Sequence, residues 1–135
     1  MGPFSGSQYE LYLRNLVKKY NLENQIFFAN AEFGDIKWGA LHGSKAMISA
    51  THGENFGISL VESLSLGKPV LTTFKVNIYK EILKYKAGLI SKDKTKDISK
   101  ILLKFDSFNK KIKRDFSKNA LLCFKENFDL TLKKK

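Results

Sequence analysis

The sequence predicts an α/β fold in which helices cover both faces of a parallel sheet. Segments with helical spacing alternate with short strands over residues 9–91, which is the order that builds parallel sheets. The strands are nearly continuous apolar runs, as expected for strands buried on both faces. These features indicate a Rossmann-like, doubly wound sheet. With 135 residues, 43% of them apolar, we expect residues 1–135 to form a single domain.

The first elements follow from changes in hydrophobic period. Apolar residues at helical spacing predict a helix over Tyr9 to Tyr20. Asn21 to Asn24 interrupts that pattern, and the apolar run Gln25 to Ala29 predicts a buried strand. A second helix is predicted over Ile36 to His42, with Asp35 as its N-cap.

The middle of the chain continues the alternation. Ala46 to Ala50 is a second predicted strand, and a helix from Ile58 to Leu66 ends at Gly67, a residue that readily adopts the left-handed stop. Pro69 to Thr73 is the third predicted strand. The loop 51–57 therefore leaves a strand and enters a helix, which is where doubly wound sheets bind ligands.

The last third of the chain is predicted to be mainly helical. A short helix over Ile78 to Tyr85 precedes a fourth strand, Gly88 to Ser91. C-terminal helices then occupy about residues 96–135, with apolar stripes in 96–105 and 111–124. A basic amphipathic helix can lie on a membrane, but a stripe beside a parallel sheet is more often core.

The net charge of +11 is concentrated near the C-terminus. Residues 1–90 hold ten basic and seven acidic residues, and residues 91–135 hold fourteen and six. Only Arg14 and Arg114 are arginines, whereas nucleic-acid sites favour arginine, so no nucleic-acid partner is expected. The sequence has a lone Cys123 and neither a signal-peptide nor a membrane-span pattern, which predicts a protein of the cytoplasm or of the cytoplasmic membrane face.

Glu54 and Glu62 flank the start of the helix that follows loop 51–57. One interpretation is structural: Ser59 and Glu62 have the spacing of a capping box, which leaves Glu54 an ordinary loop carboxylate. The other is a binding site. Free N–H groups at a helix start favour phosphate, and Gly57 lets a ligand approach the backbone. Carboxylates beside such a site are better suited to neutral hydroxyls, so the pattern outlines a nucleotide-sugar.

The same residues resemble a known family. The stretch from Glu54 to Glu62, followed by 65–70, resembles the Glu-x7-Glu block of the group 1 retaining glycosyltransferases of GT-B fold. Further similarity lies in residues 34–38, 76–82 and 87–90 and in the turn at residues 2–3, so the resemblance covers about residues 2–128.

That resemblance implies the donor-binding, C-terminal half of a retaining, metal-independent glycosyltransferase without a cofactor. Glu62 would hold ribose hydroxyls and Glu54 hydroxyls of the transferred sugar. The remaining implied donor-site residues are Thr51, Asn55, Phe56, Gly57 and Ile58, which lie near the sugar and diphosphate, and Ala29, Asn30 and Ala31, which lie near the base. The substrates would be a nucleotide-diphosphate sugar and a glycan or lipid-linked acceptor, in surface polysaccharide or glycoconjugate biosynthesis.

Several departures from the family pattern shape this expectation. The family's acceptor-binding N-terminal domain, the first strand of its donor domain and a basic pair that neutralises diphosphate have no counterpart in residues 1–135. We therefore expect an incomplete enzyme, inactive alone, with a sheet edge open to self-association. The alternatives are a non-catalytic interaction module and a basic α/β domain that binds nucleic acid or an anionic membrane.

Overall fold

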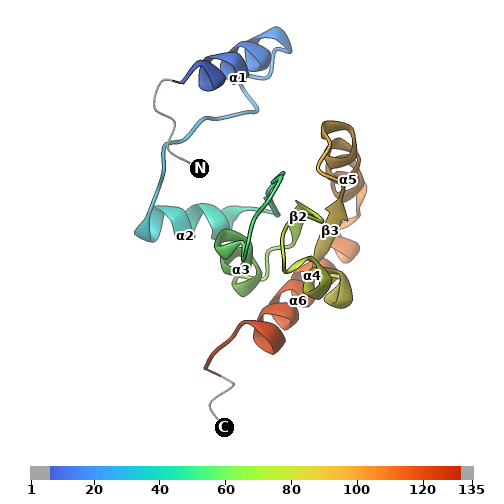
Figure 1. Cartoon of the computed structure of the whole chain (residues 1–135). Coiled ribbons are helices and arrows are strands. Elements are labelled where there is room, and N and C mark those ends of the chain that lie inside the picture. The colour runs from blue at the N-terminus through green and yellow to red at the C-terminus, as the bar shows by residue number, and fades with distance from the viewer. Residues whose placement is uncertain (1–6, 132–135) are drawn as a thin grey trace. The chain divides into compact units, whose positions relative to one another are not determined.

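The structure, a computed structural model, describes residues 7–131. The chain divides into two compact units, residues 1–40 and 41–135, which are taken in turn. Figure 1 shows the elements along the chain. The turn predicted at residues 2–3 lies outside the described residues.

The first unit is built around helix α1, Gln8–Lys19. Its N-cap Ser7 accepts a hydrogen bond from the Glu10 amide at 3.2 Å, and Arg14 bonds Glu10 at 2.8 Å one turn along. The Arg14 guanidinium also lies 4.5 Å from the centre of the Phe28 ring. These contacts connect the helix to the extended segment that follows it.

The strand predicted over Gln25 to Ala29 is wrong. The Gln25 and Ile26 amides both donate to the Leu22 carbonyl at 2.9 Å, so this segment begins as a turn. Ile26 is 44% exposed and Phe27 80% exposed. A strand needs a neighbour for its backbone groups, and the sheet found in the described residues contains only the three strands of the second unit.

Helix α2, Gly34–Gly43, runs from the first unit into the second. Asp35 was expected to cap it, and that expectation is also wrong, since Asp35 lies inside the first turn. An acidic residue there still favours the positive end of the helix.

The second unit holds the parallel sheet that the sequence predicts. Its strands are β1 (Met47–Ile48), β2 (Val70–Thr73) and β3 (Gly88–Ser91), in the order β1-β2-β3. Both pairings are parallel, with Met47 opposite Val70 and Thr73 opposite Ser91. All four residues of β2 are buried, as expected for a central strand covered on both faces.

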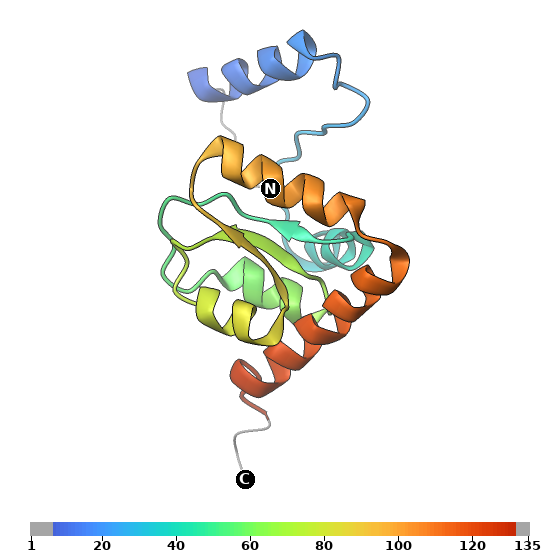
Figure 2. The same ribbon diagram turned by 90° about the vertical axis from the view of Figure 1, so that its right-hand side faces the viewer.

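Helices cover both faces of this sheet (Figure 2). Helices α3 (Ile58–Ser65) and α4 (Tyr79–Tyr85) lie on one face, and α5 (Thr95–Ser107) lies on the other. Helix α6, Lys110–Asn127, packs on α3 and α4. The main core cluster lies on the α3, α4 and α6 side of the sheet, and its buried members are Leu60, Leu64, Val70, Val76, Ile78, Ile82, Ala87, Ala120 and Cys123.

The helix boundaries follow the sequence signals. Helix α3 ends at Ser65, and Gly67 adopts a left-handed φ of 66° beyond it, as predicted. Asn109 caps α6 by accepting a hydrogen bond from the Ile112 amide at 2.9 Å. Among residues 7–131, no helix has both the length and the apolar character needed to cross a membrane.

Candidate functional site

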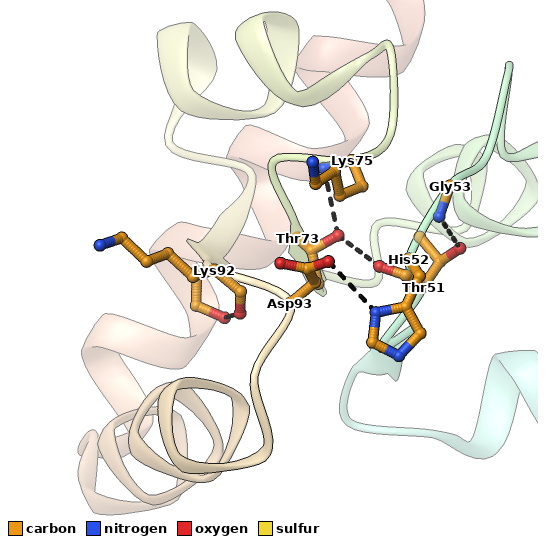
Figure 3. A network of polar contacts seen from close by, with 8 residues as sticks. Thr51, His52, Gly53, Thr73, Lys75, Lys92 and Asp93 are labelled. Atoms are coloured by element: carbon orange, nitrogen blue, oxygen red, sulfur yellow. Dashed lines mark hydrogen bonds and ion pairs between the residues drawn. The ribbon is translucent and has the colours of Figure 1, made fainter.

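The candidate site lies at the carboxyl ends of the three strands, where loops 49–57, 74–78 and 92–94 leave the sheet. Polar contacts connect these loops to one another (Figure 3). Ligands of doubly wound sheets bind at this edge. The loop from β1 to α3 holds five of the ten residues that the sequence analysis assigned to donor binding, and α3 holds two more.

Two buried threonines of β2 hold the loop after β1. The Thr72 hydroxyl donates to the Ser49 carbonyl at 2.9 Å, and the Thr73 hydroxyl donates to the Thr51 carbonyl at 2.7 Å. Thr73 also accepts from the Lys75 amide at 3.2 Å. These hydroxyls extend the pairing of β1 and β2 beyond the two residues of β1, because they satisfy backbone groups that the ladder no longer reaches.

The backbone of Glu54 is attached to the loop after β2. Its amide donates to the Lys75 carbonyl at 3.0 Å, and its carbonyl accepts from the Asn77 amide at 3.4 Å. Glu54 and Val76 thereby form an isolated parallel bridge. The residue itself is exposed. The loop therefore presents a carboxylate to solvent from a fixed backbone position.

His52 and Asp93 connect the loops after β1 and β3. Their Nδ1 and Oδ2 atoms lie 3.1 Å apart, as Figure 3 shows. The hydrogen bond with His52 is the main cause that lowers the pKa of Asp93, and a backbone hydrogen bond and the positive charge of Lys75 lower it further. The His52 side chain is 81% exposed, so the pair lies at the surface of the site.

Helix α3 begins differently from the capping-box interpretation. Its N-cap is Gly57, at a left-handed φ of 68°, and no side chain caps the helix. Ser59 lies within the helix, so the capping box of Ser59 and Glu62 is not formed. Glu62 is half-buried in the second turn. The first turn therefore has backbone amides that no cap side chain satisfies.

The remaining residues of this loop differ in their surroundings. The Thr51 hydroxyl accepts from the Gly53 amide at 3.1 Å. The Phe56 ring packs edge-on against Phe128 with ring centres 5.9 Å apart, so the end of α6 supports the loop. Asn55 and Ile58 are exposed.

The three predicted base-site residues, Ala29, Asn30 and Ala31, belong to the first unit. They lie in neither helix nor strand, with Ala29 and Asn30 exposed and Ala31 half-buried. Cavities of about 400 Å³ in the first unit and about 310 Å³ in the second are lined by other residues. Seven of the ten predicted residues thus lie in the second unit, in the loop after β1 and in α3, and the other three lie in the first unit.

The sequence analysis missed the polar contacts that hold the site together. Thr73 and Asp93 were not singled out, although each lies at or just beyond the end of a predicted strand, and that position was the available signal. Buried Cys123 has its pKa raised to about 11 by burial, so its thiol is not a nucleophile near neutral pH. Within residues 7–131, no group of three His, Cys, Asp or Glu side chains is placed to hold a metal ion.

Comparison with known proteins gives one family and one fold. A family described as "Glycosyl transferases group 1" matches residues 2–121. A comparison with curated proteins found no match.

Three solved structures resemble the chain closely in fold. Sucrose-phosphate synthase from Thermosynechococcus elongatus matches with a TM-score of 0.81 and 15% identity, over 96% of this chain and 32% of its own. WaaG, a glycosyltransferase involved in lipopolysaccharide biosynthesis, matches with a TM-score of 0.79 and 18% identity, over 96% of this chain and 33% of its own. The C-terminal domain of LpcC, a glycosyl transferase group 1 family protein from Francisella tularensis, matches with a TM-score of 0.76 and 18% identity. This match covers 90% of this chain and 63% of that domain's chain.

These likenesses confirm the predicted fold class, an α/β domain with a parallel sheet that matches domains of GT-B glycosyltransferases. The chain spans about a third of the length of the first two structures and about two thirds of the third.

Proposed function

The chain belongs to the group 1 glycosyltransferases, and we propose that it is the donor-binding domain of a retaining member. The observation that carries the proposal is the fixed position of the Glu54 loop. That loop is attached through its backbone to the loop after β2 and leads directly into the uncapped start of α3. A carboxylate and free helix amides therefore lie side by side in sequence at the ligand-binding edge of a parallel sheet.

In the proposed complex, the two glutamates bind neutral hydroxyls at opposite ends of the donor. Glu62 accepts hydrogen bonds from the ribose, and Glu54 accepts them from the transferred sugar. The backbone amides of Phe56, Gly57 and Ile58 face the sugar and the diphosphate between them. Thr51 and Asn55 complete the sugar side, and Ala29 to Ala31 supply the base contacts.

Stabilisation of the leaving diphosphate is the chemical task of this site. As the bond from the sugar to the diphosphate breaks, negative charge grows on the diphosphate oxygens. The positive end of α3 favours that charge, and Lys75 supplies a cation in the loop after β2. In this proposal, transfer retains the configuration of the sugar and uses no metal.

We propose that the acceptor is a glycan or a lipid-linked sugar of surface polysaccharide or glycoconjugate biosynthesis, and that the reaction takes place in the cytoplasm or at its membrane face. Acceptor binding in this scheme requires a second domain. Residues 1–135 alone then bind the donor and do not transfer it.

Two isosteric variants test the site, with Glu126→Gln on the exposed surface of α6 as the matched control. Glu62→Gln should weaken binding of both nucleoside diphosphates and nucleotide-sugars by about tenfold or more, since a charge-assisted hydrogen bond is lost. Glu54→Gln should weaken the binding of nucleotide-sugars by a similar factor and leave the binding of free nucleoside diphosphates unchanged. Ligand-observed NMR with UDP, GDP and ADP and their sugar conjugates measures both effects.

The control variant should bind like the unmodified chain. Unchanged ligand spectra at millimolar concentration for every nucleotide-sugar would contradict donor binding and would favour a non-catalytic interaction module. An equal loss of binding affinity in all three variants would show that the binding is not localised at the two glutamates.

A further inference from the structure

A basic cavity lies at the amino ends of the strands, whereas the candidate donor site lies at their carboxyl ends. It has a volume of about 260 Å³ and is lined by five cations, Lys45, Lys68, Lys110, Lys113 and Arg114, together with two serines. Lys45 precedes β1 and Lys68 precedes β2. Residues before parallel strands lie at the amino ends of the strands, whereas the Glu54 loop follows a strand, so the two sites are separate.

No ion pair among the described residues involves the cations of the basic cavity. No carboxylate lines it. The ion pairs found among the described residues involve other cations, namely Arg14, His52 and Lys100. Lys113 donates to a backbone carbonyl, that of Asp106, at 2.8 Å. Gathering like charges around one concave site disfavours the folded state, unless an anion occupies it.

The start of α6 also gathers positive charge that no acidic residue of its first turn offsets. Lys110, Lys111 and Lys113 lie at or near its first turn, which contains no acidic residue. Cations are unfavourable at this end because the helix dipole places partial positive charge there. Residues that break such a local rule without compensation are expected at functional sites. An anion in the basic cavity would interact favourably with both the lysines and the helix start.

The cavity walls are held in place by short contacts. The backbone of Gly67 lies so close to α6 that an added Cβ would be 3.3 Å from the Ser117 carbonyl oxygen, which keeps Lys68 beside that helix. The Ser44 hydroxyl donates to the Leu41 carbonyl at 2.7 Å. The backbone thus brings cations from three separate segments, residues 45, 68 and 110–114, around one cavity.

We propose that the basic cavity binds a phosphate-bearing anion. Lysine ammonium groups bind phosphate as point charges, and Arg114 offers a bidentate fork. The phosphate can come from a soluble compound or from the headgroup of an anionic lipid, because both present the same oxygens. This site is additional to the donor site and does not depend on the proposed donor binding.

The test compares two double variants of the full chain with equal charge change. Lys68→Gln/Arg114→Gln removes two cations from the basic cavity, and Lys80→Gln/Lys84→Gln removes two exposed cations from α4. Titration calorimetry with inorganic pyrophosphate at constant ionic strength probes the soluble source. Sedimentation with phosphatidylcholine vesicles, with and without phosphatidylglycerol, probes the lipid source. Thermal unfolding confirms that both variants are folded.

Saturable binding to either probe is expected, weakened about tenfold or more by the cavity variant and less than about twofold by the control. Weakening by the cavity variant separates this binding from the donor site, since Lys68 and Arg114 lie outside the Glu54 loop and α3. Equal weakening in both lysine variants would show diffuse electrostatic attraction and overturn the proposal. Failure to bind both pyrophosphate and anionic vesicles would overturn it as well.

Discussion

Gly57 determines at a single residue how the loop turns into α3. Its φ of 68° is left-handed, and a Cβ there would lie 3.1 Å from a Val76 methyl and 3.2 Å from a Leu60 methyl. Gly57→Ala should therefore lower the free energy of unfolding by about 1–2 kcal/mol, the cost of a left-handed residue with a side chain. Chemical denaturation measures this change.

Gly53→Ala, in the same loop, is the matched control. A Cβ on Gly53 meets nothing within 4 Å, and Gly53 has no positive φ. Its unfolding free energy should stay within about 0.5 kcal/mol of the unmodified chain. A similar loss in both variants would mean that the loop tolerates no substitution, whatever the backbone angle.

The contact between His52 and Asp93 predicts a shifted carboxyl titration. The hydrogen bond with His52 lowers the Asp93 pKa below its ordinary value of 3.8. Because the folded pKa is depressed, the stabilising contribution is complete above the unfolded pKa and is lost as the pH falls through the folded pKa. Carbon-detected NMR should show Asp93 titrating below 3.8, and His52→Ala should raise that midpoint. An Asp93 midpoint unaffected by His52→Ala would contradict the contact.

The residues of the candidate site could be predicted only in part from the sequence. The Glu54 loop could be predicted because all its signals are local. They are the spacing of Glu54 and Glu62, the glycine at 57, and the position of the loop between a predicted strand and a predicted helix. The pairing of His52 with Asp93 joins residues 41 positions apart, and no local pattern reports such a contact. The alternative interpretation, a capping box formed by Ser59 and Glu62, is wrong because the N-cap of α3 is Gly57, two residues before Ser59.

At the scale of elements, β2 and β3 pair at a distance that only glycine permits. A Cβ on Gly88 would lie 1.9 Å from the Val70 carbonyl oxygen, and backbone atoms in a central strand cannot move away. Gly88→Ala should cost about 3 kcal/mol or more, at the upper end of overpacking effects. Thermal unfolding followed by circular dichroism measures the loss.

Gly39→Ala in α2 serves as the comparison, since a Cβ there meets nothing within 4 Å. Alanine is also the better helix former, so this variant should be neutral or slightly stabilising. If Gly88→Ala destabilised the fold as little as Gly39→Ala, the close approach of Gly88 to the Val70 carbonyl would be incorrect.

The strands that the sequence predicted correctly are those with partners in the second unit. The predicted strand Gly88 to Ser91 matches β3 in both bounds, and Pro69 to Thr73 differs from β2 by one residue. Gln25 to Ala29 has an equally apolar pattern but is not a strand. Hydrophobic pattern indicates which residues can be buried, whereas strand formation also requires a neighbour to pair with.

At the scale of the whole molecule, the hydrophobic core belongs to the second unit. Every buried residue of the main core cluster lies between Leu60 and Cys123. In the first unit, Val17 is the buried apolar side chain among the described residues. Marginal stability comes from buried apolar area in excess of the entropy of ordering the chain, so the two units should differ strongly in their ability to fold.

A chain of residues 34–135, which keeps α2 intact, should therefore unfold in one cooperative transition. Residues 1–33 alone should show little helix and no transition, because an isolated helix of 12 residues is marginal in water. Circular dichroism during urea titration distinguishes the two fragments. The 34–135 fragment should also keep its response to pyrophosphate, since every residue lining the basic cavity lies within it. A non-cooperative 34–135 fragment would show that the core of the second unit is insufficient and that residues before 34 contribute to it.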